Sequence, residues 1–265
     1  MSQSLQGQTA LVTGSTAGIG YAIAAALARQ GARVIVNGRT QARVDAALQS
    51  LRKESGGAAT FEGIAADVGT AAGSKAIVDK YPDVDILINN AGIFAVQPFL
   101  ESHDDEWQKF YEVNVLSGVR LSRAYLGGML KRNRGRIVFI SSESGVQIPA
   151  EMIHYGMTKS AQISIARGLA QLTAGTAVTV NSVLPGPTRS EGVGTFVEDF
   201  ARKQGVSVAE FEKQFFKTAR PTSLLQRFIE PNEVADVVAF VASPAASAIN
   251  GASVRAEGGV VLSAF

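Results

Sequence analysis

A tyrosine and a lysine stand four residues apart in the segment HYGMTKSAQ, residues 154–162. Residues at positions i and i+4 of a helix lie on one face, so a helix here would place the Lys159 ammonium group beside the Tyr155 phenol. A free tyrosine has a pKa of about 10, and an acid or base catalyst works best with a pKa near the working pH. A cation nearby stabilises the phenolate and lowers that pKa. The two residues are therefore either a surface pair without consequence or a phenol prepared for proton transfer.

A glycine-rich stretch, TGSTAGIG at 13–20, could bind phosphate. It follows a β-branched run and opens a helical pattern, with its glycines spaced GxxxGxG. Glycines permit a tight turn and close backbone approach, and the helix that follows presents free N–H groups and a positive dipole end to a pyrophosphate. A tight turn without a ligand is the alternative. The residues expected to contact a dinucleotide here are Gly14, Ser15, Thr16, Gly18, Ile19 and Gly20.

The end of the second expected strand decides which dinucleotide fits. An acidic residue there would accept from the ribose hydroxyls of NAD, whereas an arginine suits the 2′-phosphate of NADP. The chain reads VNGRT, with Arg39 and no acid, and Asn37 and Thr40 stand beside it. NADP(H) is therefore favoured. NAD(H) stays an alternative, because Ala17 supplies no second cation and Arg39 could instead face the solvent.

The elements that must position these residues alternate along the chain. Short apolar, β-branched runs predict strands at 9–14, 32–38, 59–67, 84–92, 135–142, 177–186 and 251–259. Helical patterns lie between them at 18–30, 40–54, 70–80, 104–131, 154–173 and 231–242. Nearly continuous apolar strands are typical of a parallel sheet that helices cover on both faces. The pattern predicts a three-layered α/β fold, a Rossmann-like doubly wound parallel sheet of about seven strands.

No linker or repeat divides the chain, so residues 1–265 are expected to form a single domain. Residues 187–229 break the rhythm, because they carry only weak helical patterns between a strand and the last helix. Ligands bind outside the carboxyl ends of such sheets, and a long insertion there can cover a substrate. The insertion is rich in aromatic residues, which suggests an apolar pocket or a small core: Phe196, Phe200, Phe211, Phe215, Phe216 and Phe228.

Composition excludes several classes of protein. The net charge is +2, so nucleic acid is not an expected partner. The basic run KRNRGR at 131–136 is interpreted as a solvated helix end and loop, with anion contacts as the alternative. There are no cysteines and two histidines, which excludes disulfides, thiolate catalysis and a histidine-rich metal site. The N-terminus does not resemble a signal peptide, and no apolar run is long enough to span a membrane. A cytoplasmic protein is expected.

The combined motifs resemble the short-chain dehydrogenase/reductase family over essentially the whole chain. TGSTAGIG, NNAG at 89–92, a mid-helix Asn114, Ser142, YGMTK at 155–159 and PGPT at 185–188 occur in that family's order and spacing, with Ser142 thirteen residues before Tyr155. The resemblance implies an oxidoreductase that transfers a hydride between NADP(H) and a carbonyl or secondary alcohol. It implies Tyr155 as general acid/base, Lys159 as its partner and ribose ligand, and Ser142 as the group that holds the substrate oxygen. Asn114 would hold a water for a proton relay, or be a plain core asparagine.

The same resemblance assigns further contacts. Asp67 and Val68 would lie at the adenine, although Asp67 could equally be a helix N-cap. In NNAG, Asn90 would brace the sheet while Ala91 and Gly92 lie near the adenosine ribose. The nicotinamide carboxamide would meet Pro185, Gly186 and Thr188. The substrate would meet Phe94, Gln147 and His154 besides Ser142 and Tyr155, with His154 interpreted as structural or substrate-lining.

The resemblance also implies a homotetramer or homodimer, with helices 104–131 and 154–173 at one interface and the apolar tail GGVVLSAF at another. Glu257 replaces an aspartate that the family often has, which weakens any specific turn contact there. Three other functions are alternatives. An NAD(H)-dependent alcohol dehydrogenase of the same family and a non-catalytic dinucleotide sensor share the fold. A serine hydrolase lacks support, because the sequence has no G-x-S-x-G motif.

Overall fold

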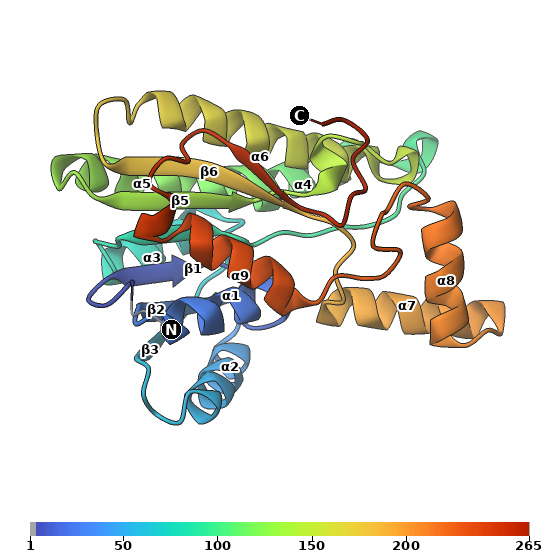
Figure 1. Cartoon of the computed structure of the whole chain (residues 1–265), viewed down its shortest axis with the longest axis horizontal. Coiled ribbons are helices and arrows are strands. Elements are labelled where there is room, and N and C mark those ends of the chain that lie inside the picture. Colours follow the sequence, from blue (N-terminus) through green and yellow to red (C-terminus); the bar gives the residue numbers. More distant parts are fainter. Residues whose placement is uncertain (1–3, 265) are drawn as a thin grey trace.

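The computed structural model describes residues 4–264, apart from the side chains of residues 191, 192, 195, 196, 199, 200 and 204. Its centre is a seven-stranded sheet in the order β3-β2-β1-β4-β5-β6-β7, in which all neighbouring strands are parallel (Figure 1). The strands are β1 (Thr9–Val12), β2 (Arg33–Gly38), β3 (Phe61–Ala65), β4 (Ile86–Asn89), β5 (Gly135–Ile140), β6 (Val178–Pro185) and β7 (Ser253–Ala256). The predicted doubly wound parallel sheet is confirmed, and each strand lies within its expected range.

Helices cover both faces of the sheet. One face packs against α1 (Gly18–Arg29), α2 (Gln41–Glu54) and α9 (Pro231–Val241), and the other against α3 (Ala71–Lys80), α5 (Ser117–Lys131) and α6 (Ile153–Gln171). Alternation along a strand divides the side chains between the two cores: Val12 packs in the first, and Leu11 in the second. Burial on both faces explains why the strands read as continuous apolar runs.

The helix expected over 104–131 is interrupted. It begins as α4 (Asp104–Tyr111), passes through a π-helical turn, η2 (Glu112–Leu116), and continues as α5. Such turns occur inside helices at functional sites, and this one carries Asn114. Single 3₁₀ turns complete the fold: η1 (Phe99–Glu101), η3 (Glu143–Gly145), η4 (Ala150–Met152) and η5 (Pro244–Ala246).

Residues 187–229 form two full helices rather than the weakly helical excursion expected from the sequence. α7 (Glu191–Gln204) and α8 (Val208–Thr218) project from one end of the sheet (Figure 1). Ser190 and Ser207 cap their N-termini, and Gly205 ends α7 in the left-handed conformation, with φ +67°. The segment has its own buried cluster, formed by Val197, Ala201, Phe211, Phe216 and Phe228. The side chains of Phe196 and Phe200 lie outside the described part.

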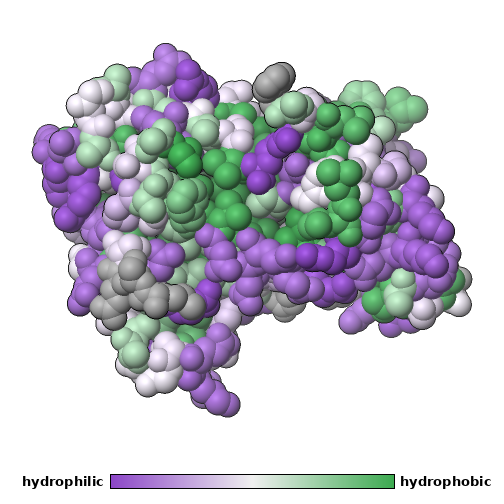
Figure 2. All heavy atoms as spheres, viewed as in Figure 1, coloured by the Kyte–Doolittle hydropathy of each residue, from purple (hydrophilic) through white to green (hydrophobic). Residues whose placement is uncertain are grey.

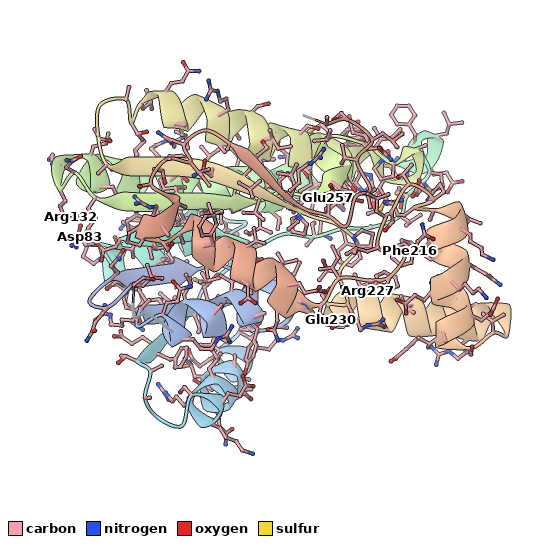
Figure 3. All side chains as sticks on the ribbon, in the orientation of Figure 1. Asp83, Arg132, Phe216, Arg227, Glu230 and Glu257 are labelled. Carbon is pink, nitrogen blue, oxygen red and sulfur yellow. The ribbon has the colours of Figure 1, made fainter. Side chains whose placement is uncertain are left out.

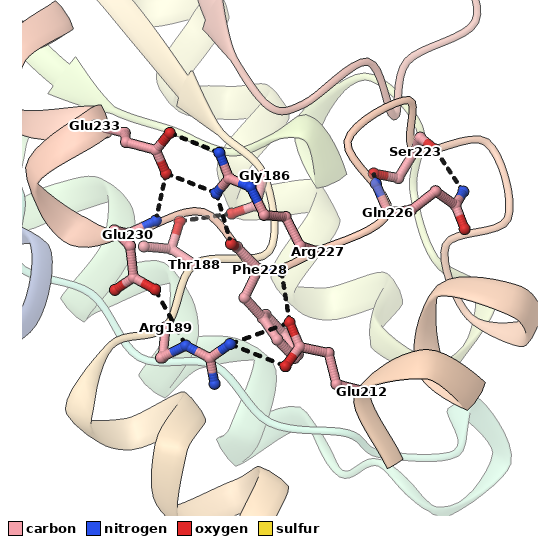
Figure 4. Close-up of polar contacts among 10 residues, drawn as sticks. All are labelled: Gly186, Thr188, Arg189, Glu212, Ser223, Gln226, Arg227, Phe228, Glu230 and Glu233. Atoms are coloured by element: carbon pink, nitrogen blue, oxygen red, sulfur yellow. Dashed lines mark hydrogen bonds and ion pairs between the residues drawn. The ribbon is translucent and has the colours of Figure 1, made fainter. Parts of the chain in front are cut away.

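Ion pairs fasten this helical segment where it leaves and rejoins the sheet (Figure 4). Arg189 donates to both carboxylate oxygens of Glu212 at 2.9 and 3.1 Å and to Glu230 at 3.2 Å. Glu212 also accepts from the backbone N–H of Phe228 at 3.1 Å. One arginine thus joins the start of the segment to α8 and to the residue that precedes α9.

The opposite end of the sheet is fastened by Arg132, which pairs with Asp83 at 2.5 Å (Figure 3). The labelled Glu257 lies in the C-terminal segment, where its carboxylate accepts from the backbone N–H groups of Val260 and Val261. A specific turn contact is therefore present at this position, although glutamate replaces the aspartate that the family often has. None of the helices in the described residues could cross a membrane.

Candidate active site

A cavity of about 620 Å³ lies at the carboxyl ends of β4, β5 and β6, beneath α7 and α8. This is the side of the sheet where α/β proteins bind ligands, next to the point between β1 and β4 where the strand order reverses. Ser142, Tyr155 and Lys159 line the cavity together. The helical segment contributes apolar walls: Val193, Phe211, Phe215 and Phe228. Three of the four predicted catalytic residues therefore share this cavity with the aromatic insertion, whereas Asn114 does not line it.

Lys159 is a buried residue, so it is no surface partner of Tyr155. Its side chain is only 5% exposed, and its Nζ lies 5.5 Å from the centre of the Tyr155 ring. Nζ donates to the carbonyl oxygen of Ile140 at 2.9 Å and to Oε1 of Gln162 at 3.2 Å. The end of β5 and the next turn of α6 thus hold the ammonium group against the phenol.

The pKa values of this pair are set mainly by burial. Burial lowers the pKa of Lys159 from 10.5 to about 7, with the Glu143 carboxylate acting against the change. Burial raises the pKa of Tyr155 above its usual value, and Glu143 acts in the same direction, whereas the Ser142 hydrogen bond and Arg220 oppose it. The protein groups alone therefore keep the phenol protonated. They do not produce the lowered tyrosine pKa that the sequence suggested.

The two neighbouring serines have different roles. Ser141 Oγ donates to the carbonyl oxygen of Lys159 at 2.8 Å and so holds β5 to α6. Ser142 caps η3, where its Oγ accepts from the N–H of Ser144 at 3.1 Å. The Ser142 hydroxyl donates to Oε2 of Glu143 at 2.5 Å. Geometry, and not only spacing, thus distinguishes Ser142 from its neighbour.

Asn114 is buried, and its side-chain amide forms three hydrogen bonds with its neighbours. Its Nδ2 donates to the carbonyl oxygen of Ile93 and to Oγ1 of Thr158, both at 3.0 Å, and its Oδ1 accepts from the N–H of Ile93 at 2.8 Å. The amide therefore joins η2 to the loop after β4 and to α6. The backbone oxygen of Asn114 accepts from Nε2 of Gln162 at 2.7 Å, which links it to Lys159 through that side chain.

The N-terminus of α1 has the features of a phosphate site. Its N-cap, Ala17, supplies no side-chain hydrogen bond, and no acidic residue lies in the first turn. By contrast α2, α3, α7 and α8 are capped by the side chains of Thr40, Thr70, Ser190 and Ser207. The free N–H groups of α1 are thus left for an anion.

Glycine is required at two positions of this turn. Gly14 has φ +61°, and a Cβ there would meet Cα of Ala91 at 3.0 Å. A Cβ on Gly20 would collide with Nδ2 of Asn90. The turn therefore packs directly on the NNAG segment, and the residues present fit a dinucleotide pyrophosphate.

Several residues expected near the cofactor support the turn instead of presenting a free group. Asn37 is buried; its Oδ1 accepts from the N–H of Gly14 at 3.3 Å, and its Nδ2 donates to the carbonyl oxygens of Ile64 and Ala66. A contact between its side chain and a 2′-phosphate is therefore not supported. Asn90 braces the sheet as expected, since its Nδ2 donates to the carbonyl oxygens of Thr13 and Gly14 at 2.8 and 3.1 Å.

Other expected cofactor residues are more accessible. Asp67 is exposed, and its Oδ1 accepts from the N–H of Gly69 at 3.0 Å. The N-cap of α3 is Thr70, so the capping alternative for Asp67 is wrong. Arg39 is exposed at the end of β2, and its guanidinium has no hydrogen bond or ion pair to any other residue in the described range 4–264. Arg39 is thus free to meet an anion.

The residues expected at the nicotinamide lie around the same cavity. Gly92 and Thr188 both line the cavity, as do Pro185, Gly186 and Ile19. Thr188 is buried, and its hydroxyl donates to the carbonyl oxygen of Gly186 at 2.9 Å. Ala91 donates its N–H to Thr13 Oγ1 at 3.0 Å, and Val68 is buried after β3. Ser15 holds the turn by donating to Val12 O at 2.7 Å.

Of the expected substrate residues, Phe94 lines the cavity but two others do not. His154 is 2% exposed and packs edge-on against Phe110, with ring centres 4.2 Å apart, on the side of α6 that faces α4. Burial lowers its pKa, so it is a neutral core residue. Gln147 is exposed outside the cavity lining. His154 is thus structural, one of the two roles left open for it, because helical geometry turns it to a different face of α6 from Tyr155. Gln147 precedes α6 and does not line the cavity, so the structure does not support its assignment to the substrate.

Sequence reasoning missed three polar residues of the site. Glu143 and Arg220 line the cavity and pair at 3.0 Å, and Gln162 binds Lys159. A charge directly after Ser142, in a turn that follows a buried strand, was the available signal for Glu143. Arg220 carried no such signal, because its partner lies 77 positions away.

A doubly wound parallel sheet, with a glycine turn at its switch point and a tyrosine beside a buried lysine, defines a dinucleotide-binding oxidoreductase fold. The short chain dehydrogenase family matches residues 8–200. The chain belongs to that family and is an NAD(P)-dependent oxidoreductase.

Known relatives extend the match over the whole chain. It is 48% identical over 265 residues to the uncharacterized oxidoreductase YvaG of Bacillus subtilis, with all of both chains covered. It is 34% identical to the 3-oxoacyl-[acyl-carrier-protein] reductase FabG of Vibrio cholerae, over 97% of this chain and 99% of that one. The structure of L-sorbose reductase from Gluconobacter frateurii, complexed with NADPH and L-sorbose, superposes with a TM-score of 0.92 at 27% identity and covers 99% and 100% of the two chains.

Proposed function

We propose that this protein interconverts a carbonyl compound and a secondary alcohol with NADP(H), using Tyr155 as the general acid and base. The observation that supports this most is the arrangement of Ser142, Tyr155 and Lys159 on one cavity wall, at the carboxyl ends of the strands. The bound dinucleotide would supply the hydride to the carbonyl carbon, or take it from the alcohol carbon.

The residues of the chain supply the proton. In the direction of reduction, the Tyr155 phenol donates its proton to the substrate oxygen, and the Ser142 hydroxyl holds that oxygen in place. A raised tyrosine pKa suits this direction, because the proton is present at neutral pH. Lys159, when protonated, stabilises the phenolate that is left, since its Nζ is held beside the ring by Ile140 and Gln162.

NADP(H) is the cofactor proposed, for two reasons. Arg39 offers an unpaired guanidinium at the end of β2, where the 2′-phosphate would lie. The L-sorbose reductase that this chain resembles in structure is complexed with NADPH. Gly14, Gly18 and the uncapped start of α1 would hold the pyrophosphate.

A homo-oligomer, a tetramer or a dimer, is proposed as the working form. Figure 2 shows hydrophobic surface on the face formed by α9, β7 and the C-terminal segment. Exposed apolar side chains there include Leu224 and Leu225, Phe240 and Leu262. Such a patch is typical of an interface between subunits. A cytoplasmic location stays a prediction of the sequence.

Substitution of Tyr155 by phenylalanine tests the reaction. Tyr155→Phe removes only the hydroxyl, so it should retain NADPH binding, measured by nucleotide fluorescence, and lose nearly all ketone reduction. Phe94→Leu, in the same cavity, serves as the matched control and should keep measurable turnover. Undiminished turnover by Tyr155→Phe would contradict the proposed role. Failure of the native protein to bind either NADPH or NADH would contradict the enzymatic function as a whole.

A further inference from the structure

A buried carboxylate adjoins the serine that would hold the substrate oxygen. Glu143 is 4% exposed and lines the cavity. Its Oε2 accepts from the Ser142 hydroxyl at 2.5 Å, and its Oε1 accepts from Nε of Arg220 at 3.0 Å. Arg220 follows Ala219, the C-cap of α8, and also approaches Glu151 at 3.5 Å. The Glu143 carboxylate therefore accepts one hydrogen bond on each oxygen, from the Ser142 hydroxyl and from the Arg220 guanidinium.

The contact with Glu143 conflicts with the proposed role of Ser142. A serine hydroxyl has a single proton to donate. While Ser142 donates that proton to Glu143, it can only accept a hydrogen bond, and cannot donate one to a carbonyl oxygen. If Ser142 turns its proton to a substrate, Oε2 loses this donor while it remains buried. Such a loss is unfavourable unless another donor replaces the hydroxyl.

The substrate itself can bring the replacement. Oxygens on adjacent carbon atoms are separated by roughly the length of one hydrogen bond, 2.5–3.0 Å, and Ser142 Oγ and Glu143 Oε2 are 2.5 Å apart. A hydroxyl next to the carbonyl would thus reach Oε2 when the carbonyl oxygen accepts from Ser142. A methyl or methylene group at the same place would leave Oε2 without a donor.

We propose that Glu143 determines specificity by selecting neutral substrates with a hydroxyl on the carbon next to the carbonyl, that is, α-hydroxy ketones. This inference rests on the proposed reductase function and names its substrate class. The hydroxyl of the substrate displaces the Ser142 hydroxyl from Oε2, and the freed Ser142 proton turns to the carbonyl oxygen. No covalent step is added to the reaction.

Arg220 is the positioning residue of this arrangement. It fixes Oε1 so that Oε2 faces Ser142, and its guanidinium gives the buried carboxylate an ion-pair partner at 3.0 Å. Its guanidinium also lies 5.9 Å from the centre of the Phe215 ring. Arg220 is already paired with Glu143 and Glu151, whereas Oε2 of Glu143 accepts from the Ser142 hydroxyl and needs a new donor once that hydroxyl turns to a substrate. A substrate carboxylate next to the carbonyl would be repelled by Glu143.

Two ketones of matched shape test the inference. Hydroxyacetone and butanone differ by a hydroxyl in place of a methyl group, so NADPH-dependent kcat/KM is measured for both. The native protein should prefer hydroxyacetone at least tenfold. In Glu143→Gln, the amide donates to Ser142 Oγ instead of accepting from it, so hydroxyacetone should lose about tenfold in kcat/KM while butanone does not fall. Glu62→Gln, at an exposed pair with Arg33, should leave the ratio unchanged.

The hydroxyl of hydroxyacetone also makes its carbonyl chemically more reactive. The decisive quantity is therefore how the ratio of kcat/KM for hydroxyacetone to that for butanone changes from the native protein to Glu143→Gln. An equal ratio in both would overturn the inference and leave the reductase function intact, as would faster reduction of pyruvate than of hydroxyacetone. Glu143→Gln could fail to fold. In that case the native protein alone tests the inference, and equal kcat/KM for butanone and hydroxyacetone would overturn the inference. Reduction of no ketone at all, with NADPH bound, would reject the reductase function together with the inference.

Discussion

The side-chain amide of Gln162 binds Lys159: its Oε1 lies 3.2 Å from Nζ, one helical turn along α6. The other end of the same amide, Nε2, donates to the backbone oxygen of Asn114 at 2.7 Å. Gln162 is fully buried, with 1% of its surface exposed. One uncharged side chain thus connects the lysine of the site to the π-helical turn. The relay water expected beside Asn114 would have to share its backbone oxygen with this amide.

Replacing Gln162 by leucine should weaken both the fold and the site. Gln162→Leu removes an acceptor from Lys159 and a donor from the Asn114 carbonyl, and both partners are buried. A buried polar group left without a partner costs about 1–3 kcal/mol. We expect the free energy of unfolding, measured with urea, to fall by about that amount, and kcat to fall more than KM rises. Gln171→Leu, at the exposed end of the same helix, is the control; equal losses in both variants would refute a specific role.

Lys159 should make the stability of the protein depend on pH. Its pKa is 10.5 as a free side chain and about 7 in the folded protein. Between these values the unfolded chain binds the proton and the folded chain does not, so stability rises with pH across this window. Below pH 7 both states are protonated and the contribution of Lys159 is constant.

The comparison variant for this effect is Lys159→Met, which keeps the length of the side chain and has no charge. Between pH 7.5 and 9.5 the free energy of unfolding of the native protein should rise relative to the variant, by at most about 1.4 kcal/mol per pH unit. Urea unfolding without nucleotide, below the range in which tyrosines titrate, measures it. Parallel curves for the two proteins would mean that Lys159 keeps an ordinary pKa in the fold.

Periodicity and turn residues were enough to predict the sheet and most helices. The strands around Leu11 and Val12 are apolar because both sheet faces are covered, and that signal is local in the sequence. The π-helical turn at Asn114 was not predictable, because it changes the register of a helix without changing its apolar pattern. Tertiary contacts of the Asn114 side chain with Ile93 and Thr158 stabilise that register.

The catalytic residues were predictable from their spacing, whereas their electrostatic surroundings were not. Glu143 and Arg220 meet because the chain after α8 returns to the carboxyl end of β5, and no local sequence pattern predicts such a contact. Burial also decides the pKa of Lys159, and burial depends on what covers the side chain. His154 illustrates the same limit: the sequence left it structural or substrate-lining, and only its packing against Phe110 shows that it is structural.

Arg39 should determine which nucleotide the protein prefers. Its exposed guanidinium follows β2 with no acidic residue beside it, and Thr40 Oγ1 is occupied as the cap of α2. One charge-assisted contact with the 2′-phosphate contributes about 1.5–3 kcal/mol, which is about 10- to 100-fold in affinity. Arg39→Ala should weaken NADPH binding by that factor and leave NADH binding nearly unchanged, in paired fluorescence titrations of both nucleotides. Because the contact is electrostatic, the preference for NADPH should also shrink as the salt concentration is raised.

Tighter binding of NADH than of NADPH by the native protein would contradict this prediction. It would mean that the Arg39 side chain faces the solvent and does not contact the nucleotide, and alcohol oxidation with NAD would then be the reaction to assay first.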